Sequence, residues 1–133
     1  MKNELKKHLE EFGYEVKDFG PDTYDAEDDY PDFIRPAAEA LAKDSENSRA
    51  ILIGGSGQGE AIVANRISGV RAVVLCAYNE DIIRLSREHN NANALSIGAR
   101  FLDLNEAKSA VKIWLETPFA GGRHERRIKK IDE

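Results

Sequence analysis

A short apolar run that breaks into glycines constrains this chain most. Residues 51–60 read Ile-Leu-Ile-Gly-Gly-Ser-Gly-Gln-Gly-Glu. The run Ile51–Ile53 is long enough for one buried strand, and Glu60 stands where a following helix would begin. Glycines at such a turn let the backbone approach a ligand closely, with several N–H groups free to hold an anion. The spacing matches neither the Walker A pattern nor G-x-G-x-x-G, so the kind of ligand stays open at this point.

Length and charge limit the class of protein. The chain has 133 residues, of which 41% are apolar and 32% charged, and we predict one domain over residues 1–133 with its own core. The net charge of −5 argues against a surface built for nucleic acid, although residues 121–133 form a basic helical tail. No stretch has the character of a membrane span or a signal peptide. We therefore expect a cytoplasmic protein with no nucleic-acid and no membrane partner.

The single cysteine, Cys76, excludes an internal disulfide and any metal site built from several cysteines. It follows the apolar residues Val73 to Leu75, so we expect a buried structural thiol. Two other residues are assigned to the scaffold, because His8 lies in a charged helical face and Trp114 in an apolar helix stripe.

Apolar periodicity alternates between helical and strand spacing along the chain. Helices are expected over residues 1–12, 31–43, 60–66, 81–89 and 105–115, followed by the tail, and strands over residues 14–19, 50–53, 72–75 and 94–97. Residues 20–30 are acidic and rich in turn formers, which predicts a surface loop. Strands this short, separated by helices, predict an α/β fold whose parallel sheet is covered on both faces.

Ligands of such folds gather at the carboxyl ends of the strands. The glycine loop after Ile53, the segment after Cys76 and the turn Gly98–Arg100 should therefore lie along one edge of the sheet. The chain begins with a helix, whereas a doubly wound sheet normally begins with a strand that the first helix packs against. Either the fold is a variant without that strand or the sequence starts inside a longer one.

Five short segments together resemble one known family. They are Asp29–Asp32 (Asp-Tyr-Pro-Asp), the loop 54–60, residues 87–93 (Arg-Glu-His-Asn-Asn-Ala-Asn), Gly98–Arg100 and residues 121–127 (Gly-Gly-Arg-His-Glu-Arg-Arg). In this order they resemble the ribose-5-phosphate isomerase B family, which includes the galactose-6-phosphate isomerase subunits. The resemblance covers nearly the whole chain. It implies a Rossmann-like αβα three-layer sandwich with a parallel sheet, a homodimer or dimer of dimers with active sites at the subunit interface, and aldose–ketose isomerisation of a sugar phosphate in the pentose phosphate pathway, without metal or organic cofactor.

Isomerisation of this kind moves a proton between C1 and C2 through an enediolate. It needs a base, donors for the oxyanion, a group that opens the sugar ring and a cationic phosphate clamp. Many family members carry a cysteine as the base in the glycine loop, and Ser56, a poor base without activation, takes that place here. A subgroup with serine uses the glutamate that ends the loop, and Glu60 matches it. Glu60 is therefore the candidate base, with Ser56 as a substrate ligand; the alternative is a carboxylate that only complements a helix N-terminus.

The resemblance also assigns the oxyanion hole and the ring-opening group. The N–H groups of the loop, including Gly55, Gly57 and Gly59, would form the hole, although a tight turn would also need these glycines. His89 resembles the ring-opening histidine, with Asn90 contacting substrate. The alternative for His89 is a favourable charge at the end of a helix.

A group of basic residues resembles the phosphate ligands of the family: Arg100, Arg123, His124 and Arg127. Guanidinium forks suit a dianionic phosphate better than lysine does. The spacing of Arg123 and Arg127 puts both on one helix face. The alternative for such a basic C-terminal run is a solvated tail.

The family normally opens with a strand that ends in a Gly-Ser/Thr-Asp-His-Ala-Gly loop, whose Asp and His contact the sugar. Nothing in this sequence matches that loop, and residues 1–5 correspond to the helix that follows it. Because that strand would be central in the sheet, we expect exposed apolar surface and an unpaired strand edge.

Three functions remain open. The first is interconversion of ribose 5-phosphate and ribulose 5-phosphate by a homodimer, with a hexose phosphate as the alternative substrate. The second is a non-catalytic or partner subunit that binds sugar phosphate without turnover. The third is a nucleotide-binding module, which is disfavoured because neither phosphate-loop fingerprint is present.

Overall fold

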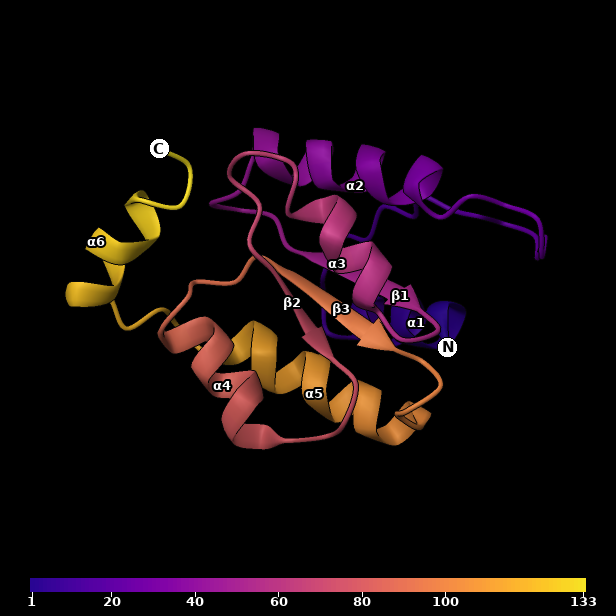
Figure 1. Ribbon diagram of the computed structural model, residues 1–133. Coiled ribbons are helices and arrows are strands. Elements are labelled where there is room, and N and C mark those ends of the chain that lie inside the picture. Colours follow the sequence, from indigo (N-terminus) through magenta and orange to yellow (C-terminus); the bar gives the residue numbers. More distant parts are fainter.

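Three parallel strands form the centre of the molecule in a computed structural model that describes residues 1–133 (Figure 1). The strands are β1 (Ala50–Gly54), β2 (Ala72–Leu75) and β3 (Ala94–Gly98), in the spatial order β1-β3-β2. Leu95 of β3 lies beside Ile51 on one side and Val73 on the other. The helices are α1 (Lys2–Glu11), α2 (Pro31–Lys43), α3 (Gln58–Ala64), α4 (Glu80–Glu88), α5 (Leu104–Glu116) and α6 (Arg123–Lys129).

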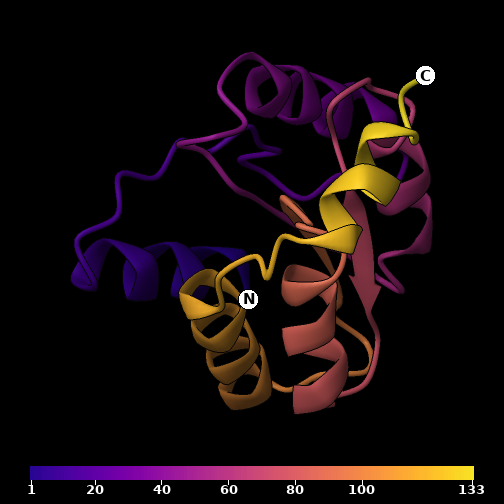
Figure 2. The same ribbon diagram turned by 90° about the vertical axis from the view of Figure 1, so that its left-hand side faces the viewer.

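Helices cover both faces of the sheet, which gives three layers (Figures 1 and 2). Leu95 and Ile97 of β3 pack with Trp114 in a core against α1, α4 and α5. Ala94 packs with Leu52 in a second core against α2 and α3. Every residue of β3 is buried, as a central strand between two helical layers requires. The predicted three-layer α/β fold with a parallel sheet is confirmed.

Local sequence signals set the helix ends. Pro31 occupies the start of α2, where its missing N–H costs nothing. Asn79 caps α4 by accepting from the Ile82 N–H at 3.1 Å, and Asp103 and Glu106 form a capping box at the start of α5. The bounds of α1 to α5 and of the three strands lie within two residues of those predicted, and the tail helix is shorter than the basic segment.

The predicted strand over residues 14–19 is wrong. Beyond Tyr14, no backbone group of this segment hydrogen-bonds to another backbone group, so it has no ladder partner. A groove of about 340 Å³ separates it from β1 and is lined by apolar side chains that include Leu5, Phe33 and Ile53. β1 has a neighbour, β3, on one side only. The unpaired edge and the apolar surface expected from the sequence are therefore present at β1.

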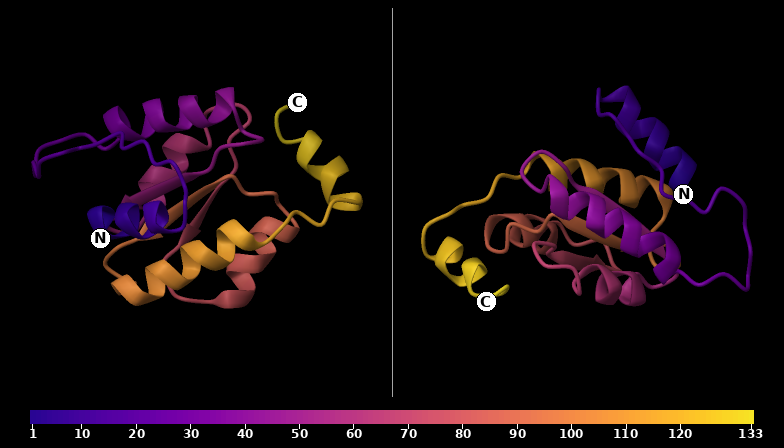
Figure 3. Two further views of the ribbon diagram at one scale, coloured as in Figure 1. Left: turned by 180° about the vertical axis from the view of Figure 1, so that it is seen from behind. Right: turned by 90° about the horizontal axis from the view of Figure 1, so that it is seen from above.

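Two surface predictions have opposite outcomes. Residues 20–30 form the expected exposed loop, which extends away from the rest of the molecule (Figure 3). Cys76, by contrast, is exposed rather than buried. The reason is that β2 ends at the buried Leu75, so Cys76 is the first residue beyond the strand and stands at the rim of the sheet.

Candidate active site

The glycine loop is bound to the carboxyl edge of the sheet by its neighbours. The Ala99 N–H donates to the Gly54 carbonyl at 2.8 Å, and the Arg100 N–H donates to the Gly55 carbonyl at 3.1 Å. A Cβ at Gly98 would lie 3.3 Å from the Cβ of Cys76. The glycine loop, the segment after Cys76 and the turn Gly98–Arg100 therefore lie together along the carboxyl edge of the sheet, as predicted.

Two glycines are required by this close packing. Gly57 has a φ of +77°, and a Cβ there would lie 3.1 Å from the Ser96 carbonyl oxygen. A Cβ at Gly98 would lie 2.7 Å from the carbonyl oxygen of Ser56. The hydroxyl of Ser96 donates to the Gly57 carbonyl at 2.6 Å and holds the loop down on β3.

Most backbone donors of the loop have no partner within the protein. The N–H groups of Gly55, Ser56, Gly57 and Gly59 make no hydrogen bond, while the Gln58 N–H donates to the Ser56 hydroxyl oxygen at 3.3 Å. A cluster of free N–H groups suits an oxyanion, because preorganised donors stabilise developing negative charge without reorganisation. The glycines thus form a tight turn and leave several N–H groups without a partner in the protein.

Glu60 is the buried acid of this edge. It is 9% exposed, and its carboxylate lies so close to Gly54 that a Cβ on that glycine would overlap it. The carboxylate has neither a hydrogen-bond donor nor a cation as a partner. Nε1 of Trp114 is the one side-chain polar atom that is both fully buried and without a hydrogen-bond partner. The Glu60 oxygens also lack partners, so neither of them can be fully buried. A carboxylate that is sheltered, unpaired and still reachable has the properties of a general base.

Two further side chains border the loop. The guanidinium of Arg100 lies against Gly55, where a Cβ would approach it to 3.2 Å. The Tyr30 ring lies against Gly59 and leaves no room for a side chain there. Tyr30 belongs to the Asp-Tyr-Pro-Asp segment, and its place beside the loop could not be read from local spacing. Glu60, Ser56, Arg100 and the free N–H groups form what we call the loop cluster.

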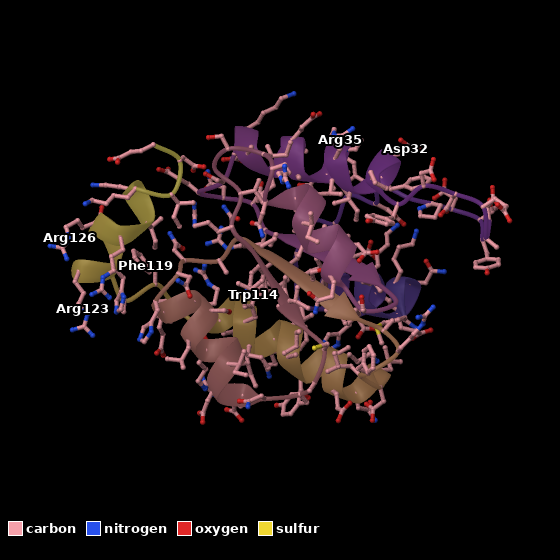
Figure 4. All side chains as sticks on the ribbon, in the orientation of Figure 1. Asp32, Arg35, Trp114, Phe119, Arg123 and Arg126 are labelled. Carbon is pink, nitrogen blue, oxygen red and sulfur yellow. The ribbon has the colours of Figure 1, made fainter.

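A second group, which we call the tail cluster, forms where α6 meets the end of α4. The rings of His89 and His124 stack with centroids 4.3 Å apart and an interplanar angle of 14°. Arg123 and Arg127 stand on the exposed side of α6, one turn apart, as predicted. Figure 4 shows Arg123 and Arg126 projecting away from the body of the molecule. Asn90 follows His89 directly and completes the cluster.

The environment of the tail cluster changes the protonation of one histidine. Loss of solvent, followed by the charges of His89, Arg123 and Arg127, lowers the pKa of His124 below its usual value. The shift favours the neutral form of His124, while Arg123 and Arg127 bring positive charge to the tail cluster.

The two clusters lie at opposite ends of the strands. The loop cluster follows the carboxyl end of β1, whereas His89 ends α4, which leads into the amino end of β3. The five residues of β3 span about 16 Å. Figure 1 accordingly shows α6 on the far side of the molecule from the start of α3. One chain therefore brings together the members within each cluster, but it does not bring Glu60 to His89, nor Arg100 to Arg123 and Arg127.

The rest of the chain offers no cluster of three or more His, Cys, Asp or Glu side chains that could hold a metal ion. None of its helices combines the length and the apolar composition needed to cross a membrane.

Fold and site define an α/β protein whose glycine loop carries a buried carboxylate and whose basic groups suit a phosphate. Residues 1–131 match the model of the Ribose/Galactose Isomerase family, and the chain belongs to this family. The resemblance seen in the sequence is thereby confirmed.

Curated relatives are similar over nearly the full chain. A probable ribose-5-phosphate isomerase B of Mycoplasma genitalium is 40% identical over 98% of this chain and 85% of its own length. Ribose-5-phosphate isomerase B of Escherichia coli is 42% identical, with the same two shares. The solved structure of the Mycoplasma genitalium enzyme with bound ribulose 5-phosphate superposes with a TM-score of 0.93, at 40% identity, over 98% of this chain and 84% of that one. The enzyme of Clostridium thermocellum gives a TM-score of 0.90 at 44% identity, over 98% and 86% of the two chains.

Proposed function

We propose that this protein interconverts ribose 5-phosphate and ribulose 5-phosphate. The observation that carries the proposal is the Glu60 carboxylate, which is sheltered and unpaired beside a loop with four free N–H groups. A relative of the same family with a TM-score of 0.93 has been solved with ribulose 5-phosphate bound, which supports this choice of substrate. Because charged sugar phosphates do not cross a bilayer unaided, we place the reaction in the cytoplasm.

The loop cluster supplies the proton transfer. In the direction from aldose to ketose, Glu60 removes the proton from C2, and the electron pair of that bond forms the C1–C2 double bond of the enediolate. The former carbonyl oxygen at C1 takes up negative charge, which the free N–H groups and Ser56 stabilise. The hydroxyl proton on the C2 oxygen then passes to the oxygen on C1, and the electron pair left on the C2 oxygen forms the carbonyl at C2 while Glu60 returns its proton to C1. The substrate is oxidised at C2 and reduced at C1, so no external oxidant or reductant is needed.

The tail cluster supplies ring opening and most of the phosphate clamp. His89 moves a proton between the ring oxygen and the anomeric hydroxyl, with Asn90 as a hydrogen-bonding partner of the sugar. Arg123, Arg127 and His124 bind the phosphate together with Arg100 of the loop cluster. Metal and organic cofactors have no part in this scheme.

A second copy of the chain unites the two clusters. Ile82 and Leu85 are 54% and 42% exposed, and they share one face of α4 with His89. Around the glycine loop, Tyr30 and Phe101 are also large and exposed. Apolar patches of this kind favour association. We place the outer face of α4 against the carboxyl edge of a partner, so that the partner's His89 reaches Glu60; a dimer or a dimer of dimers contains such a contact.

The direct test is turnover by purified protein. Ribose 5-phosphate should yield ribulose 5-phosphate, and Glu60→Gln should lower kcat by about 10²- to 10⁴-fold, because the base is lost while shape and burial are kept. Glu39→Gln on the exposed side of α2 is the matched control and should leave kcat unchanged. Turnover that survives Glu60→Gln in a folded protein would remove Glu60 from the base role.

The alternative is a sugar-phosphate-binding subunit without turnover. The observation that favours it is the groove beside β1, which leaves one edge of the sheet unpaired. Such a subunit would be stabilised against heat by ribose 5-phosphate while forming no ribulose 5-phosphate. Robust turnover would contradict this alternative.

A further inference from the structure

Arg87, in the last turn of α4, is a buried cation without a carboxylate partner. It is 5% exposed and takes part in none of the ion pairs of the protein. Burial, followed by the positive charges of Arg49 and Arg71, lowers the pKa of Arg87 to about 10, so it stays charged at neutral pH. A buried charge is costly unless hydrogen bonds compensate it. The hydrogen bonds of Arg87 therefore explain what this cation does.

The guanidinium of Arg87 joins two segments that are far apart in the sequence. Its Nη1 donates to Oδ1 of Asn91 at 2.9 Å and to the carbonyl of Ala92 at 2.6 Å, in the turn that follows α4. Its Nε donates to the carbonyl of Thr117 at 3.1 Å, where the chain leaves α5 for the tail. Trp114 lies beneath the group, with the guanidinium carbon 5.8 Å from its ring centroid.

The two segments are those that carry the tail cluster. The turn after α4 contains His89 and Asn90, and it bends through Asn91, which has a φ of +45°. Beyond Thr117 the tail runs alongside the end of α4, where the Ala120 N–H donates to the Glu88 carbonyl at 3.1 Å, and then places His124 on His89. The guanidinium of Arg87 therefore bonds to both segments close to the point where His124 stacks on His89.

We propose that Arg87 is a positioning residue, which fixes the spacing between His89 and the phosphate-binding residues of the tail by bonding to both segments. The proposal rests on the proposed isomerase function. A guanidinium suits this role because its donors point in fixed, divergent directions, whereas the single ammonium of lysine cannot reach both segments in the same geometry. Arg87 does not touch the substrate in this scheme and acts through the residues it holds.

The test compares Arg87→Lys and Arg87→Gln with Arg84→Gln. Arg84 is the matched control, because it is an exposed arginine of the same helix whose ion pair is with Glu80 at 2.6 Å. The first readout is an NMR titration of the histidine rings, which needs no turnover. Both Arg87 variants should raise the pKa of His124 toward its usual value, since a displaced tail regains solvent. Arg84→Gln should leave the pKa of His124 as in the wild type.

The second readout is turnover, measured well below the unfolding midpoint of each variant. Arg87→Lys should lower kcat/KM by about 10- to 100-fold, because small misplacement of reacting groups is costly. A folded Arg87→Lys with wild-type kcat/KM and wild-type titration of His124 would overturn the proposal. A wild type without turnover would contradict the isomerase function, while the titration would still decide the role of Arg87.

Asn91→Gly keeps the proposal testable if both Arg87 variants fail to fold. Glycine accepts the positive φ of this position, so the substitution removes one acceptor of Arg87 and keeps the turn. It should shift the His124 pKa in the same direction by a smaller amount. An unchanged titration of His124 in this variant, with Arg87 variants unfolded, would assign Arg87 to stability alone.

Discussion

Single residues decide where the reacting groups of this protein can stand. Gly54 ends β1 and faces the Glu60 carboxylate so closely that no side chain fits between them. Gly57 and Gly98 likewise leave no room for a side chain between the loop and β3. The glycines therefore do more than permit a turn, because they set how deeply the carboxylate lies beside the free N–H groups.

Gly54→Ala tests this directly. The new methyl group would overlap the Glu60 carboxylate, which can move as the end of a flexible side chain, so the fold should survive while the proposed base is displaced. We expect kcat to fall by about 10²-fold, as for other displacements of a reacting group. Steady-state turnover and thermal unfolding, measured on the same preparation, separate the two effects.

Gly13→Ala is the control for this substitution. Gly13 has a φ of +89° and no neighbour within 4 Å of an added Cβ, so alanine there should cost about 1 kcal/mol of stability through backbone strain alone. Its kcat should equal that of the wild type. Wild-type turnover by Gly54→Ala would show that the position of Glu60 is not set by this contact.

At the scale of elements, we predict that the docking of α6 on α4 depends on pH. The pKa of His124 is lowered in the folded protein, so acidification protonates His124 in the detached tail first. The stability contributed by docking is therefore complete above the usual histidine pKa of about 6.5 and is lost as the pH falls through the lowered value. Between pH 7 and pH 5 the tail should become more susceptible to protease in the wild type.

His124→Gln removes the titrating group and serves as the comparison. In this variant the same change of pH should alter cleavage of the tail much less. An equal response to acid in both proteins would mean that the stack of His89 and His124 does not control docking of α6.

The elements that local signals define could be predicted from the sequence. Pro31, Asn79 and the Asp103–Glu106 pair mark helix ends by local chemistry, and the apolar run of β3 marks a strand buried on both faces. The strand prediction for residues 14–19 failed because an apolar pattern suits a strand but does not supply one. A strand also needs a neighbouring strand to hydrogen-bond with, and this segment has none. Cys76 misled because burial ended one residue earlier than its apolar neighbours suggested.

The resemblance to the family predicted Glu60, Ser56, His89 and the arginines as site residues, and it implied active sites at a subunit interface. The sheet topology explains why these residues separate within one chain. A helix that leads into a parallel strand ends at the amino edge of the sheet, so His89 lies opposite the glycine loop. Arg87 could not be identified, because a buried arginine and a solvated one look alike in a helical sequence.

For the whole molecule, the division of the site makes association with a second copy part of the catalytic account. The outer face of α4 offers Ile82, Leu85 and His89 together, and the carboxyl edge carries the residues that would complete the proposed site with His89. Each shared site would take Glu60 and Arg100 from one chain and the tail cluster from the other. Variants of the two clusters should therefore complement one another, whereas variants of the same cluster should not.

The most direct measurement of this central claim is the turnover of mixed variants after subunit exchange. Glu60→Gln and His89→Asn should each be inactive alone. Their equal mixture should regain about a quarter of wild-type activity if a mixed dimer has one intact site of two. The control mixture of Glu60→Gln with Arg100→Gln, both in the loop cluster, should stay inactive. Recovery in the first mixture alone is the predicted result, and a first mixture no more active than its separate components would contradict the account.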